Sequence, residues 1–358
     1  MTETDPLTAL LRMTFAFTPT AVRAAATLRL PDLVEAGTTG LADLAEQSGC
    51  ERDPLGRLLR YLCLIGLFTE DGPERYALTD VGRGLLSDHP AGLRRWLDLD
   101  SDARRIEARM EGAMGHLLTA VRTGEPVYEK AYGCTFWDDL AADKELARSF
   151  DDSLAVHAGD LAREVAGSYD WGSVGHVVDV GGGTGALLAE LLGRHSGLRG
   201  TLLDMDSVVV NAPEVLAPVA DRAEIVGGSF FDALPTGADV YLIANTVHNW
   251  ADDDAVRILR RCAEAAPGHG RVVLAERLLD AKDPLLASYA DLLMLVLLGA
   301  KERTVDDFRA LGAKAGLHLA ETTRLEHPGL WLLEFTVDPA AALDGADGES
   351  AASTAAAR

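Results

Sequence analysis

Apolar and polar residues recur with two different periods along the chain, and the change of period divides it into two parts. In the first hundred residues the apolar positions have helical spacing, in AVRAAATLRLPDLVEAG and then in LADLAEQSGCERDPLGRLLRYLCLIGLF. The second stretch predicts two short helices joined by a turn around Gly49–Asp53, and RYALTDVG predicts a strand that leads into a turn. A helix, a helix–turn–helix and a short wing in this order are typical of a winged helix.

From His176 onward, short apolar strands alternate with helices, which is typical of an α/β fold with a parallel sheet. The predicted strands are HVVDV at 176–180, GTLLDMD at 200–206, ADVYLI at 238–243 and GRVVLAERLLD at 270–280. HLAETTRLE and LWLLEFTV, joined by a turn at His327–Gly329, predict a terminal β-hairpin. Such a hairpin places an antiparallel strand at or near the edge of the sheet.

These patterns divide the chain into four segments. Residues 1–100 form the winged-helix-like domain, residues 101–165 are helical and lead to the second domain, and residues 166–338 form the α/β domain. Residues 339–358 are small, polar and low in complexity, so we expect a disordered tail there.

Composition and charge exclude several classes of protein. The 358 residues contain no run of about 18 apolar residues, so we expect no membrane span, and the acidic start MTETDP lacks the basic region of a secretory signal. A net charge of −23 argues against broad contact with nucleic acid or an anionic membrane. The four cysteines are scattered without a metal-binding spacing, which predicts reduced thiols in a cytoplasmic protein.

The candidate binding chemistry begins after the first strand of the α/β domain. GGGTG at 181–185 follows HVVDV and precedes the helical ALLAELLGRH, the arrangement of a dinucleotide- or nucleoside-binding loop. Gly181, Gly183 and Ala186 also satisfy the NAD pattern, so this motif alone is ambiguous. Asp204 ends the second strand, where an acid reaches the ribose of NAD or of any adenosine ligand, or else caps the next helix. A terminal hairpin is unusual for NAD-binding domains.

With the motifs DVGGGTG, LLDMD, GGSFFD, HNW, LAER and GAKERT, the chain from about residue 10 to 337 resembles a known family. It is similar to the class I S-adenosylmethionine-dependent O-methyltransferases that act on small aromatic molecules, such as bacterial polyketides and plant phenylpropanoids and flavonoids. The resemblance implies a Rossmann-like seven-stranded sheet that ends in the antiparallel hairpin, preceded by a winged-helix dimerisation domain. It also implies a homodimer and S-adenosylhomocysteine as a product.

The resemblance assigns cofactor contacts to several positions. Asp179, Gly181, Gly183 and Gly185 hold the amino-acid end, Asp204 holds the ribose hydroxyls, Met205 lies beside the adenine, and Trp250 packs on it. Ser229 and Phe230 stand where the family commonly has an aspartate followed by phenylalanine or methionine. Because serine offers one hydroxyl rather than a carboxylate, we expect a weaker contact with the adenine amine. Ala244 stands where relatives are often polar, which removes another contact.

The stretch ANTVHNW at 244–250 carries the predicted catalytic base. A histidine just past a buried strand is either a base or an ordinary loop residue, and His248 matches the base position of the family. Glu276 in LAER and Glu302 in KERT match the two glutamates that flank this histidine, one of which orients its ring. A phenol of pKa ~10 and an imidazole of pKa ~6.5 are mismatched by roughly 3.5 units, about 5 kcal/mol. A carboxylate on the ring and the sulfonium of the cofactor close this gap, and no metal is needed.

The acceptor and the competing functions are less closely specified. By resemblance, Leu154 and His157 line the acceptor pocket and Asn249 bonds the substrate, while Trp137 and Met294 are further candidates that also suit a helix core. The predicted acceptor is a phenolic hydroxyl of an aromatic secondary metabolite, of the kind found in antibiotic biosynthesis; N-methyl and carboxylate acceptors stay open. Some bacterial relatives bind the cofactor yet catalyse hydroxylation, decarboxylation or cyclisation, and His248 favours methyl transfer.

Two functions of other classes also stay open. A winged helix is able to bind DNA, but Arg52, Arg57 and Arg60 are interspersed with Glu51 and Asp53 and do not form a phosphate-binding face. A scaffold that binds the cofactor without catalysis is the other alternative.

Overall fold

The structure, a computed structural model, describes residues 5–279, 283–326 and 329–337, and for residues 154–158 it describes the backbone alone. The predicted turn at His327–Gly329 and the predicted tail therefore lie wholly or largely outside the described residues. The chain forms two compact units, the first made of Met1–Arg109 and Leu140–Val156 and the second of Met110–Asp139 and His157–Arg358. No described helix combines the length and apolarity needed to cross a membrane.

The first unit is a small helical domain with a two-stranded wing. Its elements are α1 (Pro6–Met13), α2 (Phe17–Thr27), α3 (Leu30–Glu35), α4 (Leu41–Ser48), α5 (Arg52–Leu64), β1 (Phe68–Glu70), β2 (Tyr76–Leu78), α6 (Asp80–Arg83) and α7 (Leu93–Leu97). α4 ends at Gly49, whose φ of 67° is the left-handed geometry that glycine adopts readily. The antiparallel pair β1–β2 follows α5, so the helix–turn–helix and wing predicted from the sequence are present.

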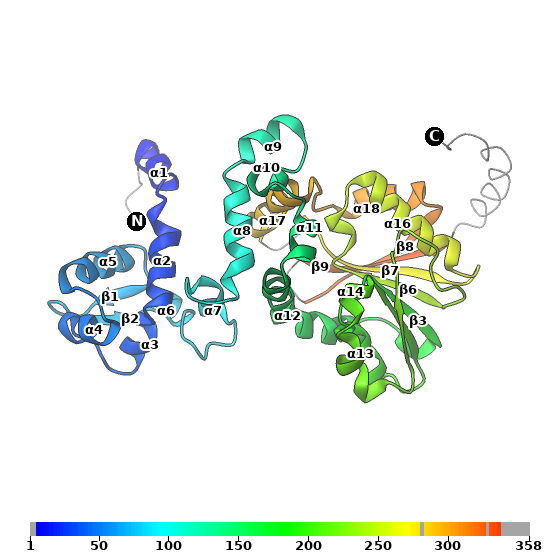
Figure 1. The fold of residues 1–358 in the computed structure, drawn as a ribbon, viewed down its shortest axis with the longest axis horizontal. Helices are drawn as coiled ribbons and strands as arrows, with labels where there is room; N and C mark the ends of the chain where they lie inside the picture. The colour runs from blue at the N-terminus through cyan, green and yellow to red at the C-terminus, as the bar shows by residue number, and fades with distance from the viewer. Residues whose placement is uncertain (1–4, 280–282, 327–328, 338–358) are drawn as a thin grey trace. The chain divides into compact units, whose positions relative to one another are not determined.

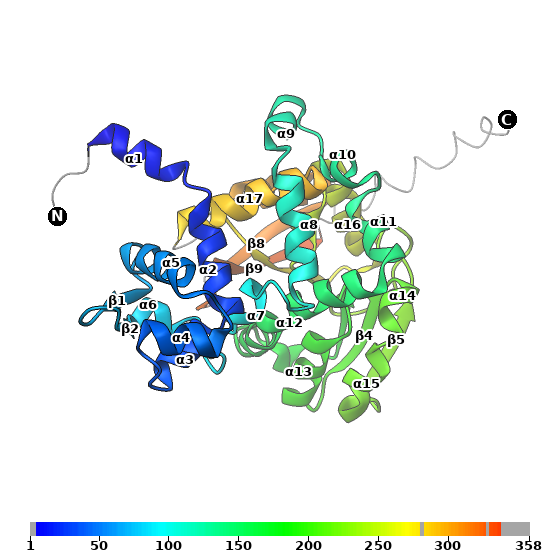
Figure 2. The ribbon, with the colours of Figure 1, turned by 60° about the vertical axis from the view of Figure 1, so that its left-hand side comes forward.

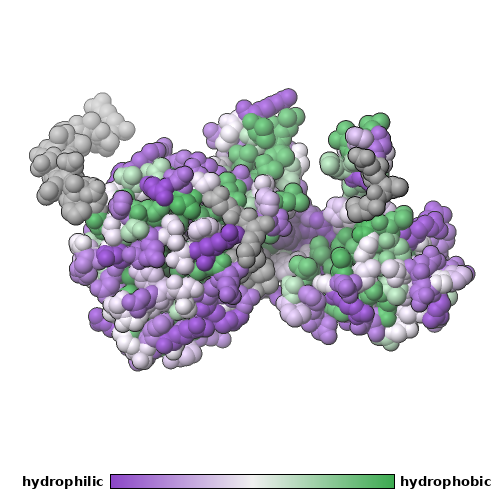
Figure 3. Space-filling view, turned by 180° about the vertical axis from the view of Figure 1, so that it is seen from behind, coloured by the Kyte–Doolittle hydropathy of each residue, from purple (hydrophilic) through white to green (hydrophobic). Residues whose placement is uncertain are grey.

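The surface of the first unit has an apolar region on α1 and α2. Large side chains are exposed there, namely Leu7, Leu10, Leu11, Met13 and Phe17. Figure 3 shows apolar surface over this part of the chain. Contiguous exposed apolar surface in a globular protein commonly marks an interaction site.

The second unit is built on the predicted seven-stranded sheet, in the order β5-β4-β3-β6-β7-β9-β8. Its strands are β3 (His176–Val180), β4 (Arg199–Asp204), β5 (Ala223–Gly227), β6 (Val240–Ala244), β7 (Arg271–Arg277), β8 (Leu317–Arg324) and β9 (Leu330–Val337). β3 to β7 are mutually parallel, whereas β9 is antiparallel to β7 and to the edge strand β8. The fold class predicted from the sequence is confirmed, including the C-terminal antiparallel pair.

Helices cover both faces of this sheet because successive strand residues point to opposite sides. On one face, Tyr241 and Val272 pack with α16 (Asp252–Ala265) and α18 (Val305–Lys314). On the other face, Leu242 packs with α13 (Ala186–Arg194) and the end of α12 (Lys144–Gly167). Figure 1 shows α16 and α18 on one side of the strands and α13 on the other. The strands are therefore almost continuously apolar, as the sequence indicated.

Further helices complete the two units. They are α8 (Arg104–Met114), α9 (Leu117–Thr123), α10 (Tyr128–Tyr132), α11 (Phe136–Ala142), α14 (Asp206–Val209), α15 (Ala212–Leu216) and α17 (Pro284–Leu298), with the short 3₁₀ turns η1 (Trp171–Ser173), η2 (Ala217–Val219) and η3 (Val247–Asn249). α14 and α15 lie against β5, beside β4 (Figure 2).

The strand order reverses its direction where β3 and β6 are neighbours. The connection from β3 leads through α13 to β4 on one side, and the connection from β6 leads through α16 to β7 on the other. In open α/β sheets, ligands bind at the carboxyl ends of the strands where this reversal occurs. The glycine loop follows β3 and η3 follows β6, so both candidate motifs meet at this point.

Candidate active site

The glycine loop after β3 has the backbone geometry of a ligand cradle. Gly181, Gly183 and Gly185 have positive φ angles of 70°, 62° and 85°, which glycine adopts without strain. A Cβ on Gly182 would lie 2.4 Å from an oxygen of Asp179, so the backbone runs directly over that carboxylate. Beside Gly183, by contrast, the space where a Cβ would stand is open.

Asp179 is fully buried at the end of β3, and neither of its carboxylate oxygens has a hydrogen-bond partner among the described residues. Burial, and then the nearby charge of Asp204, raise its pKa to about 7. Buried polar groups without a partner are rare in native proteins, and each one calls for an explanation. A cationic or hydrogen-bond-donating ligand on the glycine loop supplies one.

Asp204 connects the end of β4 to the same loop. One carboxylate oxygen accepts a hydrogen bond from Gly183 N at 2.8 Å, and the other accepts one from Met205 N at 2.7 Å. Burial raises the pKa of Asp204, while these two backbone donors lower it. Asp204 thus supports the glycine loop. The residue after Asp204 in the chain is Met205, whose side chain is exposed.

Aromatic rings form a wall beside the glycine loop. Trp250 makes edge contacts with Phe230 and Phe231, with ring centroids 5.6 and 4.8 Å apart. A Cβ on Gly181 would lie 3.4 Å from the Phe230 ring, so this wall reaches the loop. Trp137 stacks on Trp250 with an interplanar angle of 15° and a centroid separation of 6.5 Å. The predicted adenine residue and one predicted acceptor residue are therefore neighbours.

Ser229 and Ala244 are the two departures from the family pattern, and each makes a hydrogen bond within its own loop. The Ser229 hydroxyl accepts a hydrogen bond from Phe231 N at 3.1 Å and so stabilises its own turn. The carbonyl of Ala244 accepts a hydrogen bond from the Thr246 hydroxyl at 2.9 Å. Both contacts order the loops that carry Phe230 and His248.

His248 lies on η3 and contacts Glu302 directly. His248 Nδ1 and Glu302 Oε1 are 3.0 Å apart, and the two side chains are only 15% and 4% exposed. Burial alone lowers the pKa of His248, but the hydrogen bond with Glu302, the charges of Glu276 and Glu302, and a hydrogen bond with the Asn245 backbone raise it above the ordinary value. The glutamate favours the imidazolium, as a carboxylate does in a catalytic triad.

Glu276 holds the backbone that leads into His248. Its Oε1 accepts hydrogen bonds from Thr246 N at 3.0 Å and Val247 N at 2.7 Å, while its Oε2 is buried without a partner among the described residues. Burial is the main cause that raises the pKa of Glu276. The two glutamates therefore have different tasks, because Glu302 contacts the imidazole ring of His248 and Glu276 contacts the backbone just before His248.

The remaining acceptor candidates are placed less directly. Asn249 Nδ2 donates a hydrogen bond to the Asn245 carbonyl at 3.4 Å, and Met294 lies half-buried on α17, a helix that contacts η3. The side chains of Leu154 and His157 lie outside the described residues. No three His, Cys, Asp or Glu side chains in the described part of the chain gather in a way that could hold a metal ion.

Sequence reasoning missed two residues of this region. Asn245 has a φ of 45°, which is uncommon for any residue other than glycine, and its side-chain oxygen is buried without a partner among the described residues. Arg303 has a fully buried side chain that contacts both ends of the His248 turn. The KERT motif is the available signal for Arg303, and the family resemblance assigns a role only to its glutamate.

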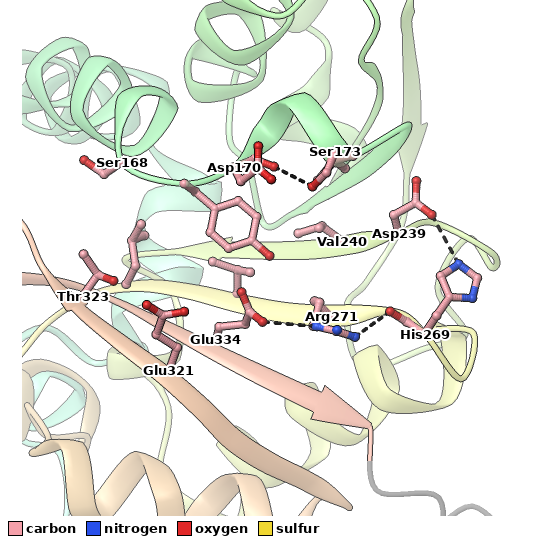
Figure 4. Close-up of a pocket in the computed structure, with 14 residues that line it drawn as sticks. Ser168, Asp170, Ser173, Asp239, Val240, His269, Arg271, Glu321, Thr323 and Glu334 are labelled. Atoms are coloured by element: carbon pink, nitrogen blue, oxygen red, sulfur yellow. Dashed lines mark hydrogen bonds and ion pairs between the residues drawn. The ribbon is translucent and has the colours of Figure 1, made fainter.

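A cavity of about 510 Å³ lies elsewhere, at the amino ends of the parallel strands. Arg271 at the start of β7 bonds Glu334 at 3.1 Å and the His269 carbonyl at 2.6 Å, and His269 lies 3.4 Å from Asp239 (Figure 4). None of the predicted site residues lines this cavity. Several of its polar groups bond one another, and the cavity lies at the opposite end of the sheet from the predicted site residues.

Two family models match the chain. One, described as an O-methyltransferase domain, matches residues 114–318, and one described as an O-methyltransferase dimerisation domain matches residues 11–88.

Individual relatives are similar to the chain over most of its length. The chain is 44% identical over 315 residues to a 2,7-dihydroxy-5-methyl-1-naphthoate 7-O-methyltransferase of Streptomyces carzinostaticus, covering 87% of this chain and 91% of that protein. It is 40% identical over 313 residues to an aclacinomycin 10-hydroxylase of Streptomyces purpurascens, covering 85% and 82%. A similar solved structure is an O-methyltransferase from neocarzinostatin biosynthesis in complex with S-adenosylmethionine and 2-hydroxy-5-methyl naphthoic acid. It has a TM-score of 0.78 at 40% identity, and the match covers 92% of this chain and 98% of that one.

Proposed function

The chain belongs to the O-methyltransferase family, and from this premise we propose that His248 removes the proton from a hydroxyl of an aromatic acceptor as that oxygen is methylated. The protein is an S-adenosylmethionine-dependent O-methyltransferase. The observation that carries the assignment of the base is the 3.0 Å contact between His248 Nδ1 and Glu302 Oε1 at the carboxyl edge of the sheet.

The contact with Glu302 determines which ring nitrogen takes the proton. When His248 Nδ1 carries hydrogen and donates it to Glu302, Nε2 has a free lone pair that faces away from the glutamate. Glu302 then stabilises the imidazolium that forms when Nε2 accepts the acceptor's proton. Since a phenol is a weaker acid than imidazolium by roughly 3.5 pKa units, the raised pKa of His248 narrows the mismatch.

The glycine loop and the neighbouring strand ends fit S-adenosylmethionine. Asp179 offers buried acceptor oxygens without a protein partner, Gly183 leaves open space, and Asp204 lies at the end of β4 beside that loop. Trp250, Phe230 and Met205 supply apolar surface for an adenine. The bound cofactor supplies a methyl group made electrophilic by its sulfonium. The protein's remaining task is to align the acceptor oxygen and to hold His248 beside it.

The acceptor we propose is a hydroxyl on an aromatic ring system. The 44% identical relative is named for a dihydroxy-naphthoate, and the similar solved structure holds a naphthoic acid. In this chain Trp137, which stacks on Trp250, supplies flat apolar surface, and Asn249 supplies an amide next to the proposed base. Non-methylating chemistry is the second candidate, because one relative at 40% identity is a hydroxylase. A base held by Glu302 favours methyl transfer.

The first unit gives the chain a dimerisation domain, since residues 11–88 match that model. We expect a homodimer in which the exposed apolar residues of α1 and α2 are covered. This assignment replaces DNA binding as the role of the winged helix. The cytoplasm is the compartment we propose, supported by four free cysteines and a net charge of −23.

A labelled-methyl assay tests the proposal. The purified protein is incubated with methyl-labelled S-adenosylmethionine and a set of hydroxylated naphthoic acids and anthracyclines, in air and under nitrogen. We expect transfer of the label to a hydroxyl oxygen, with equal yield in both atmospheres. Oxygen-dependent hydroxylation without label transfer would support the second candidate instead, and tight cofactor binding without any product would indicate a scaffold.

A further inference from the structure

Arg303 is a fully buried arginine placed against the turn that carries His248. Its side chain is 0% exposed. Nη1 donates a hydrogen bond to the carbonyl of Val247 at 3.1 Å, and Nη2 donates one to the carbonyl of Trp250 at 2.8 Å. These two carbonyls bracket His248, one residue before it and two residues after it. A planar guanidinium holds both at once in a fixed geometry, which a single ammonium cannot do.

The charge of Arg303 is balanced within the same cluster. Asp252 Oδ1 accepts hydrogen bonds from Nε at 3.2 Å and from Nη2 at 2.8 Å, and Asp252 Oδ2 pairs with Lys301 at 2.9 Å. A buried charge is costly unless it is paired and hydrogen-bonded. Asp252 begins α16, so the guanidinium connects the turn to the first residue of that helix.

The backbone of Arg303 is also held in place. Its carbonyl accepts a hydrogen bond from Leu279 N at 3.1 Å, and Glu302 N donates to Asp291 Oδ1 on α17 at 2.9 Å. Two adjacent residues of one fixed segment therefore contact η3. The Glu302 side chain bonds the imidazole ring of His248, and the Arg303 side chain bonds the backbone before and after His248.

We propose that Arg303 is a positioning residue that sets the place of both His248 and Trp250. The two residues lie two positions apart on one turn, with His248 against Glu302 and Trp250 against Phe230 and Phe231. By fixing the turn, Arg303 holds the imidazole of His248 beside the acceptor and the indole of Trp250 beside the cofactor at the same time. This inference rests on the proposed function, since it assumes that His248 is the base.

The test uses Arg303→Lys, which keeps the positive charge and removes the planar fork. A displacement of the base by about 1 Å lowers turnover by about 10²-fold, so we expect kcat to fall by about that factor. We also expect a several-fold rise in the Kd for S-adenosylmethionine, measured by calorimetry, because Trp250 loses its support. Asp252→Asn, which keeps the arginine but weakens its counter-charge, is the second variant in case Arg303→Lys does not fold. It should shift both quantities in the same direction by less.

Arg222→Lys is the matched control. Arg222 also uses one guanidinium to hold backbone carbonyls, those of Leu192, His195 and Leu198, at 2.7–3.1 Å. These carbonyls lie around the end of α13, remote from His248 in the fold. The control should lower the Tm as Arg303→Lys does and leave kcat and cofactor affinity unchanged.

A double-mutant cycle with His248→Ala completes the test. If Arg303 acts through the base, Arg303→Lys lowers kcat in the parent but has little further effect in the His248→Ala background. An unchanged kcat in both Arg303→Lys and Asp252→Asn, or an equal fall in both backgrounds, would overturn the inference. Parental activity in His248→Ala itself would instead remove the proposed function, and with it the base half of this inference.

Discussion

The two ends of the seven-stranded sheet differ in how their polar side chains are satisfied. At the amino ends of the parallel strands, several of the groups that line a cavity bond one another, such as Arg271 with Glu334. Burial and a hydrogen bond with Glu334 raise the pKa of Tyr169 in the same cavity. At the carboxyl ends there are buried polar atoms without a partner among the described residues of the second unit, in Asp179, Asn245, Glu276, Glu302 and Trp331.

This contrast supports the carboxyl ends of the parallel strands as the side of the sheet that binds a ligand. Buried polar atoms without a partner are costly to a protein, and they persist where a bound molecule or a reaction uses them. Substitutions at the carboxyl ends should therefore change function more than a substitution at the amino ends.

Replacing His248 by Ala should have the largest effect. A positioned general base is worth about 10²–10⁴ in rate, so we expect kcat to fall by that factor. The Kd for S-adenosylmethionine, measured by calorimetry, should stay near that of the parent because His248 is not among the predicted cofactor contacts. An unchanged kcat would mean that alignment of the acceptor is sufficient without a base.

Asp179→Asn should lower the affinity for the cofactor and raise the stability of the ligand-free protein. Losing a charged acceptor costs about 1.5–3 kcal/mol, so cofactor affinity should fall by about 10–10². The ligand-free protein should melt at a higher temperature, because the substitution removes a buried carboxylate that has no partner. With a pKa of about 7, Asp179 becomes protonated as the pH falls, so parental affinity should weaken below about pH 7. That pH dependence should disappear in the variant.

Glu302→Gln should move the pH dependence of turnover. In the proposed mechanism the neutral ring of His248 accepts the proton, so kcat at saturating cofactor should fall as the pH drops through the raised pKa of His248. Without the carboxylate this pKa decreases, and the acid limb of the profile should move to lower pH. Because a base weaker by one pKa unit loses up to about tenfold in rate, the plateau should also decrease. A profile that keeps the parental limb would exclude Glu302 as the group that raises the pKa of His248.

Asp239→Asn, at the amino end, should have the smallest effect on function. Asp239 accepts hydrogen bonds from Gly175 N at 2.9 Å and His176 N at 3.0 Å, which hold its pKa below the ordinary value against the effect of burial. The stabilisation from this lowered pKa is present above the ordinary pKa and is lost as the pH falls. We expect a slightly lower Tm at neutral pH and no change in kcat or cofactor affinity. A loss of activity would contradict the contrast between the two ends.

Much of this arrangement was accessible from the sequence because it depends on local patterns. HVVDV coincides with β3, and three of the four glycines after it, Gly181, Gly183 and Gly185, have the positive φ angles that their turn requires. ADVYLI was predicted from 238 and β6 starts at Val240, although the backbone of Asp239 already bonds His176 and Arg271 on the neighbouring strands. The order in which β9 enters beside β7 follows the family resemblance and the antiparallel hairpin.

Other features have no local signature. Nothing in KERT indicates that its arginine holds two carbonyls more than fifty positions earlier in the chain. The division of work between Glu276 and Glu302 depends on where the carboxylates lie relative to one turn. The boundaries of the four predicted segments and the roles of the individual site residues stay predictions.

The attachment of α17 has a consequence for how such an enzyme changes its substrate. Asp291 ties this helix to Glu302, while Met294, less than one turn further on, is a predicted acceptor contact. A library that randomises Met294 and its neighbours but leaves Asp291 intact should therefore change the predicted acceptor contact and keep the hydrogen bond that holds the backbone of Glu302. The choice of acceptor is then able to change while the proposed proton-transfer residues stay the same.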